Sequence, residues 1–172
     1  MRRYLKSVFA LTALSFAQVA IPATSTSTFT VTATVASSCT LGTSNVAFGA
    51  YNPTSGTAND ASGAALVTCT TGTTYTIALD AGVSAGGASV FSNRRMRIGA
   101  TTSYLGYQLY LDSGRVTVWG DGLNSSSINP TSGTSTGNGS QQSYTVYGRI
   151  TAGNYVTAGS YTDTVTVTLT YT

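Results

Sequence analysis

Histidine and glutamate are absent from this chain of 172 residues, and only 8% of its residues are charged. Without histidine, neither a Ser-His-Asp nor a Cys-His arrangement can form, and no histidine-ligated metal site is possible. The five aspartates include Asp112 and Asp121, which flank a predicted hairpin and could approach each other. We expect both to be turn residues that accept hydrogen bonds from nearby backbone N–H groups. The composition therefore argues against an enzyme, and it indicates no cofactor, metal or small-molecule substrate.

The first 23 residues have the parts of a secretory signal peptide. Residues 1–6 are basic, residues 8–20 are mostly apolar, and small residues follow that offer a cleavage site. The apolar part is too short for a stable membrane span. We place the cut after Ala23, with Ala17 and Ala20 as alternatives, and we favour general secretory export over a twin-arginine route.

Removal of this peptide brings the formal charge from +3 to near zero, because five arginines then face five aspartates. A neutral, weakly charged chain has no electrostatic reason to bind nucleic acid. The same property suits a protein that packs against copies of itself, since little repulsion opposes the contact.

Cys39 and Cys69 are the two cysteines of the chain. An even number of cysteines in an exported protein predicts a disulfide, and two cysteines permit a single pairing. The disulfide closes a loop of about thirty residues, which contributes roughly 3.5 kcal/mol to stability through chain entropy. A metal site is disfavoured, because no histidine or further cysteine is nearby.

Threonine, valine and tyrosine are abundant and favour strands, while 19 glycines mark turns. No long amphipathic helix follows the signal peptide, so the sequence predicts an all-β domain. About seven strands at this spacing favour an immunoglobulin-like β-sandwich. The expected strands are residues 39–42 with 46–51, then 64–69, 73–80, 90–98, 103–112, 116–119, 144–150 and 161–172. The polar tract 120–142 is too long for an ordinary hairpin and is either a mobile or a functional loop.

Strands with one apolar face stand at both ends of the mature chain. Residues 26–35 and residues 161–172 both alternate threonine or serine with apolar residues. The apolar face of the first strand is formed by Phe29, Val31, Ala33 and Val35. That of the last is formed by Val165, Val167, Leu169 and Tyr171, after Asp163 has interrupted the alternation. A strand in search of a sheet at one end, and a sheet that can accept a strand at the other, predict head-to-tail assembly.

Arg94, Arg95 and Arg97 form the one basic cluster of the mature chain. The cluster could bind an acidic glycan, a lipid head group or an acidic face of a neighbouring subunit. We favour instead an edge strand that its charges protect against promiscuous pairing.

Aromatic residues are expected inside the sheets rather than in a binding row. Tyr104 and Tyr110 fall on the strand face opposite Tyr107, so half-buried positions are predicted for all three. Trp119 is expected to anchor the core.

Several separated pieces of the sequence resemble the spore coat protein U family, the subunits of archaic chaperone–usher pili. The pieces cover the mature chain from end to end in the family's order, and their combination is specific although no single piece is. They are FTVTATV at 29–35 followed by Ser38-Cys39-Thr40, VAFG at 46–49, VTC at 67–69, LGYQLYL at 105–111, WGDG at 119–122, VYGRI at 146–150 and AGSYTDTVTVTLTY at 158–171.

The resemblance implies an incomplete immunoglobulin-like β-sandwich that lacks its final strand and is completed by donor-strand complementation. In the family, a periplasmic chaperone first lends a strand, and at an outer-membrane usher the N-terminal strand of the next subunit replaces it. The implied partners are therefore identical or related pilus subunits, a chaperone and an usher. The implied location is the periplasm and then a fibre on the cell surface.

Residue roles follow from the same resemblance. Residues 1–23 are the signal peptide, 24–37 the donor strand and 38–172 the pilin domain. The donor plugs are Phe29, Val31, Ala33 and Val35, and the acceptor-groove strand carries Val165, Val167, Leu169 and Tyr171. The family's disulfide ties the first strand to the second, consistent with Cys39 and Cys69.

Two other functions stay open. An adhesive binding module at a pilus tip is disfavoured, because tip adhesins of the family carry an extra N-terminal receptor domain for which this chain has no room. The second is a secreted coat protein that completes its own sheet with residues 29–35, although the joint to Cys39 is short. A heat-stable monomer in size exclusion would contradict the polymer, whereas ladders that resist mild heating in detergent would support it.

Substitution of Val31 by aspartate tests the donor role. Val31→Asp should leave secretion intact and block polymerisation, because a charged side chain cannot enter an apolar groove without a large desolvation cost. The measurement is the ladder of detergent-resistant multimers from the secreted protein. If fibres still form from this variant, Val31 is not a plug.

Overall fold

The computed structural model describes residues 20–122 and 135–172, and the chain divides into two units, residues 1–34 and 35–172. In the first unit, residues 20–34 contain no helix or strand, and all their side chains are exposed. Most of the predicted signal peptide, residues 1–19, lies outside the described residues. The described part of the chain holds no helix with the length and apolar character that a bilayer crossing requires.

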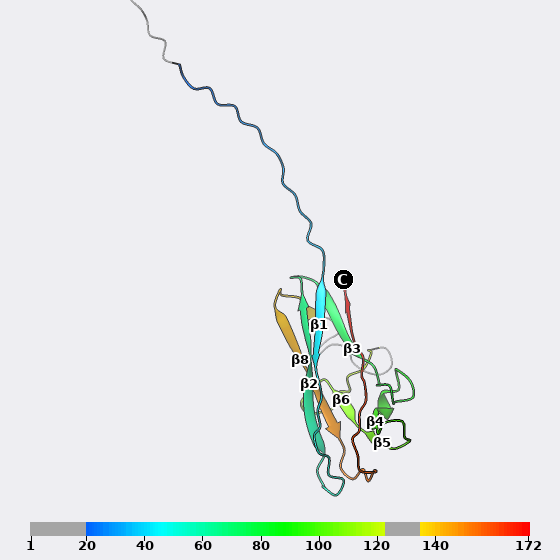
Figure 1. Ribbon diagram of the computed structural model, residues 1–172. Coiled ribbons are helices and arrows are strands. Elements are labelled where there is room, and N and C mark those ends of the chain that lie inside the picture. Colours follow the sequence, from blue (N-terminus) through cyan, green and yellow to red (C-terminus); the bar gives the residue numbers. More distant parts are fainter. Residues whose placement is uncertain (1–19, 123–134) are drawn as a thin grey trace, which may run out of the picture. The chain divides into compact units, whose positions relative to one another are not determined.

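The second unit is built from short antiparallel strands, and its described residues contain no α-helix (Figure 1). The strands are β1 (Cys39–Ser44), β2 (Asn59–Cys69), β3 (Thr74–Leu79), β4 (Arg95–Arg97), β5 (Tyr104–Gly106), β6 (Gln108–Tyr110), β7 (Ser135–Thr136), β8 (Gln141–Ile150) and β9 (Val167–Tyr171). A 3₁₀ turn, η1, covers Phe91–Asn93. The all-β prediction is therefore confirmed.

The strands of the described residues form three sheets, and two of these sheets pack as a sandwich. The larger sheet has the order β1-β2-β8-β6, the second has the order β7-β3-β9, and β4 pairs with β5. Alternate residues of β2 and β3 are buried, in agreement with this arrangement. Ala65, Val67 and Cys69 of β2 lie in one core cluster with Tyr75, Ile77 and Leu79 of β3. Because both sheets contribute to this cluster, their inner faces pack against each other.

Trp119 anchors this core, as predicted. Its side chain is fully buried, and its indole Nε1 donates a hydrogen bond to the carbonyl of Ile77 at 3.1 Å. The bond satisfies the one polar atom of the ring, which is the usual condition for burying tryptophan. Tyr104, Tyr107 and Tyr110 are half-buried, also as predicted.

Two expected strands are wrong. Residues 46–51 form no strand, because the side-chain amide of Asn59 donates to the carbonyls of Phe48 and Ala50 at 3.1 and 3.2 Å and holds this segment from the side. Residues 116–119 form no strand and contribute only two bridge residues, Val118, which pairs with Tyr110, and Trp119. There the carboxylate of Asp112 accepts the backbone N–H of Thr117 at 2.7 Å, so a turn forms where a strand was expected.

Several boundaries also differ from the prediction. The expected strand 90–98 consists of η1 and β4, the strand expected at 64–69 begins at Asn59, and the strand expected at 103–112 is divided into β5 and β6. The last strand begins at Val167 rather than at residue 161, because Asp80 binds the backbone of Thr166 through both its N–H and its carboxylate. The expected loop 120–142 contains β7 and the start of β8, while residues 123–134 lie outside the described residues.

Arg94 does not belong to a charged surface, which corrects the expectation for the basic cluster. Its side chain is only 2% exposed, and it donates to the carbonyl of Asp80 at 2.6 Å and to Oε1 of Gln108 at 2.9 Å. Burial lowers the pKa of Arg94 to about 10. Arg95 stacks over Tyr104, with 3.9 Å between the guanidinium carbon and the ring centroid, and Arg97 alone is exposed.

Removal of the Arg94 side chain should destabilise the domain. Arg94→Ala leaves the buried carbonyl of Asp80 and the Gln108 amide without this donor, so the free energy of unfolding should fall by about 3 kcal/mol. Arg97→Ala, at an exposed position of the same strand region, should change it by less than about 0.5 kcal/mol. Guanidinium unfolding of the two variants measures the difference, and equal stabilities would show that Arg94 does not hold these elements together.

Candidate functional site

A groove runs between two segments that are far apart in the sequence. One wall is formed by residues 43–53, which include the end of β1 and the segment after it. The other is formed by residues 156–167, which lead into β9 and include its first residue. The groove has two parts with volumes of about 410 and 570 Å³, and both parts are lined by Val46, Phe48, Met96 and Tyr161. Because they share these residues, the two cavities are consecutive parts of one groove.

The first wall lies close against β8. Gly148 of β8 makes this approach possible, since a Cβ at that position would come within 2.6 Å of Val46 Cγ1 and 2.8 Å of Phe48 Cζ. Val46 and Phe48 therefore reach the interior without a strand to carry them.

The floor of the groove is the hydrophobic core itself. Leu79, Leu109 and Val146 line the smaller cavity, and all three are buried members of the core or its cluster. On the second wall, Val165, Val167 and Leu169 are partly buried and pack against the same cluster. The groove is thus an opening in the sandwich that leaves apolar side chains accessible.

The backbone of the second wall has a free side. Between Thr162 and Thr172, the backbone groups of even-numbered residues form hydrogen bonds with the neighbouring segments of the domain. Thr162 bonds to Arg97, Thr166 to Asp80, and Thr172 to Thr74. Backbone groups of successive residues in a strand point to opposite edges. The N–H and C=O groups of Val165, Val167 and Leu169 therefore face the outer edge, where β9 pairs with no other strand among the described residues.

The predicted acceptor residues divide into two groups. Val165 and Val167 line the groove, and Leu169 packs beside them on the core. Tyr171 does not line it and is 43% exposed. In the other unit, the exposed fractions of Phe29, Val31 and Val35 are 89%, 82% and 80%, and Ala33 is also exposed.

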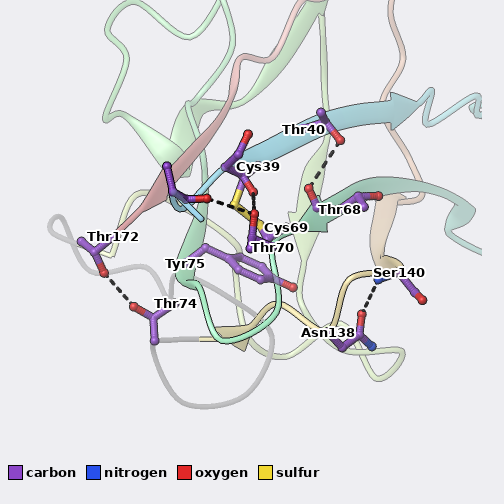
Figure 2. Close-up of a disulfide and its surroundings, with 12 residues drawn as sticks. Cys39, Thr40, Thr68, Cys69, Thr70, Thr74, Tyr75, Asn138, Ser140 and Thr172 are labelled. Atoms are coloured by element: carbon purple, nitrogen blue, oxygen red, sulfur yellow. Dashed lines mark hydrogen bonds between the residues drawn. A yellow bond between two sulfur atoms is a disulfide. The ribbon is translucent and has the colours of Figure 1, made fainter. Parts of the chain in front are cut away.

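The disulfide predicted from the two cysteines is present and joins the start of β1 to the end of β2 (Figure 2). Next to it, the N–H of Thr70 donates to the carbonyl of Ser38 at 2.9 Å. The hydroxyl groups of Thr74 and Thr172 form a hydrogen bond of 2.7 Å. Figure 2 draws this bond as a dashed line. Since residues 70 and 74 belong to one short turn, β1 starts and β9 ends at the same end of the domain.

Asp163 is the one charged residue that lines either part of the groove, among the residues described. Its Oδ2 accepts the hydroxyl of Tyr107 at 2.7 Å, and its Oδ1 accepts the backbone N–H of Ser84 at 3.1 Å. Burial, and then the bond to Asp163, raise the pKa of Tyr107. The sequence showed Asp163 only as a break in the apolar alternation, and no local pattern links it to residues 84 and 107.

Gly82 is required beside this carboxylate. Its φ of +90° is in the region that favours glycine, and a Cβ built there would collide with Oδ2 of Asp163. The backbone of Gly82 therefore packs directly against the Asp163 carboxylate, which has no space to move away from the groove.

The chemistry of the groove is that of strand binding. It presents apolar side chains and a row of backbone donors and acceptors, which are the two features that an added β-strand uses. In residues 20–122 and 135–172, no three potential metal ligands come together.

Comparison with known proteins identifies the family. The Spore Coat Protein U domain matches residues 25–168. The chain belongs to the Spore Coat Protein U domain family. Protein U of Myxococcus xanthus is 35% identical over 165 residues, which cover 87% of this chain and 86% of that protein. The resemblance seen in the sequence motifs is therefore confirmed for this family member.

A solved structure shares the fold of this Spore Coat Protein U domain. It is the pre-assembly complex of the chaperone CsuC and the tip adhesion subunit CsuE from archaic chaperone–usher Csu pili of Acinetobacter baumannii. The TM-score is 0.56 at 25% sequence identity, and the match covers 79% of this chain and 40% of that chain. The fold of this domain is thus shared with a chain from a chaperone–usher pilus complex, of which the present chain spans less than half.

The hydroxyl of Tyr107 should make the domain sensitive to alkaline pH. Because the folded-state pKa of Tyr107 is raised, its contribution to stability is complete below about pH 10, the ordinary tyrosine value, and is lost as the pH rises beyond it. Tyr107→Phe should reduce the fall in the free energy of unfolding between about pH 9 and 11. Tyr155→Phe is the control, since Tyr155 is 76% exposed. Equal alkaline slopes in the native chain and the Tyr107 variant would contradict the assignment.

Proposed function

We propose that this chain is a structural subunit of an archaic chaperone–usher pilus or surface fibre, and that its activity is assembly. Residues 24–37 of one copy fill the groove of the next copy by donor-strand exchange. The observation that carries the proposal is the groove itself, where an open apolar core and the unpaired edge of β9 occur together. A single added strand would satisfy both.

The exposed segment of the first unit has the composition of such a strand. Its apolar residues recur at every second position from Phe29 to Val35, and they are exposed in the single chain. Burial of Phe29, Val31 and Val35 would contribute roughly 1.5–3 kcal/mol each. Residues 24–37 contain no charged side chain, so no ionised side chain opposes entry into the groove.

A chaperone is proposed as the first occupant of the groove. An accessible core and a free strand edge promote unspecific aggregation, so an exported subunit needs a cover before it assembles. The fold match to a subunit crystallised with its chaperone supports this partner. By the same family relation, we propose an outer-membrane usher as the place where the next subunit replaces the chaperone.

Export precedes these steps. We propose that residues 1–23 direct the chain to the periplasm and are then removed, which leaves residues 24–37 as a free N-terminal extension. Residues 38–172 form the acceptor domain, with its incomplete immunoglobulin-like sandwich. The finished fibre lies on the cell surface.

Paired variants test the two roles of the chain separately. Val165→Asp places a charge in the groove and should abolish acceptance while leaving residues 24–37 able to donate. Val31→Asp should do the reverse. Each variant alone should stay monomeric, and their mixture should stop at a dimer, because only one productive contact remains. Size exclusion and electrophoresis without boiling measure the products.

Thr168→Asp is the matched control for the groove variant, since Thr168 is exposed on the other face of β9. It should polymerise as the native chain does. Long ladders from Val165→Asp alone would contradict the groove as acceptor. A native chain that remains a heat-stable monomer would contradict polymerisation and support self-completion of the sheet.

A further inference from the structure

We propose that Asp163 sets the register of the incoming strand, because it accepts only the small side chain of Ala33 opposite it. The resulting pairs between neighbouring copies are Ala33 with Asp163, Val31 with Val165 and Phe29 with Val167. This inference rests on the proposed function and adds to it which residue of the donor meets which residue of the groove.

The first step is the parity of the two strands. From Tyr161 to Val167 of the second wall, odd-numbered residues turn their side chains toward the core and their backbone groups toward the free edge. In residues 26–35, the apolar side chains are also odd-numbered. Directly opposed residues in a sheet have side chains on the same face, so odd must lie opposite odd. The possible registers therefore differ by steps of two residues.

The second step is the direction of the donor. Only residues 36–38 join Val35 to Cys39, and the residue before Cys39 lies at the same end of the domain as the end of β9. A donor parallel to β9 would place its own domain at this end, where the acceptor's own extension must leave. An antiparallel donor places its domain at the opposite end and keeps that extension free. Head-to-tail growth therefore requires the antiparallel direction.

The third step is the charge in the groove. The Asp163 carboxylate holds its position through the Tyr107 hydroxyl and the Ser84 N–H, and Gly82 closes the space behind it. A bulky apolar side chain opposite this carboxylate would remove water from it without offering a hydrogen bond, which is costly. Of the four apolar donor residues, alanine covers the least of the carboxylate.

These steps leave one register. With Ala33 opposite Asp163, antiparallel pairing brings Val31 opposite Val165 and Phe29 opposite Val167, so the larger side chains meet the apolar part of the wall. Val35 then meets Tyr161, where the two parts of the groove join. A shift by two residues in either direction would place Val31 or Val35 against the carboxylate.

Disulfide trapping tests the register. A chain with both Val31→Cys and Val165→Cys should form covalent ladders, because directly opposed residues of this kind lie about 5.5 Å apart between Cα atoms, within disulfide range. The native cysteines are already paired with each other. Val31→Cys with Val167→Cys, and Phe29→Cys with Val165→Cys, report the two neighbouring registers while Asp163 is kept, and should not form such ladders. The samples are compared by electrophoresis in denaturant with and without reductant.

The outcomes separate the register from the function. Covalent ladders from one of the neighbouring pairs, with none from positions 31 and 165, would overturn the register while assembly by strand exchange stands. If the native chain forms no detergent-resistant multimers at all, the proposed function fails, and the register with it.

A second pair of variants tests the cause. Ala33→Leu should slow multimer formation at least about tenfold, the equivalent of 1.4 kcal/mol, because it crowds the carboxylate. Val31→Leu, opposite the apolar wall, should have a smaller effect. Asp163→Ala in the acceptor should restore the rate of the Ala33→Leu donor, and failure of that restoration, with the acceptor folded by circular dichroism, would show that Asp163 does not select Ala33.

Discussion

The outer edge of β9 is the constraint on which the rest of the domain depends, and no strand in residues 20–122 and 135–172 pairs with it. Between residues 162 and 172, even-numbered backbone groups are bound inward, so the odd-numbered groups can be satisfied only from outside. The side chains of the same odd-numbered residues reach the core, where Val165, Val167 and Leu169 remain partly accessible. Unpaired backbone and uncovered apolar surface therefore occur along one line. Water can satisfy the first but not the second, and one further strand would satisfy both.

Polar contacts beneath this line keep the groove open. Asp80 binds the backbone of Thr166 and, through its carbonyl, the buried guanidinium of Arg94. Asp163 precedes Thr166 in the same wall, and its carboxylate accepts hydrogen bonds from the Tyr107 hydroxyl and the Ser84 N–H. These bonds hold the approach to β9 in place, so the wall cannot simply fold down over the exposed core. The polar contacts and the apolar groove therefore depend on each other, and the proposed assembly by strand exchange would use both.

Local patterns carried much of the prediction and failed at identifiable places. The cores of β2, β3 and β8 were found because their residues alternate between buried and exposed positions, which the sequence displays directly. Residues 46–51 have the composition of a strand, yet the side chain of Asn59 occupies two of their carbonyls. Arg94 has the appearance of a surface charge beside Arg95 and Arg97, yet its partners Asp80 and Gln108 are 14 residues away on either side. In both cases a side-chain hydrogen bond over a long sequence distance overrode the local preference.

The sequence by itself determined the all-β class, the disulfide pairing and the apolar faces of the two terminal segments, because composition, cysteine number and period-two alternation are local properties. Only the tertiary structure decided that residues 43–53 and 156–167 stand opposite each other as walls of a groove. It alone also decided that Asp163 lies in that groove and is fastened to Tyr107, 56 residues earlier. These positions depend on how the two sheets pack against each other. That packing depends on contacts between residues that are far apart in the sequence.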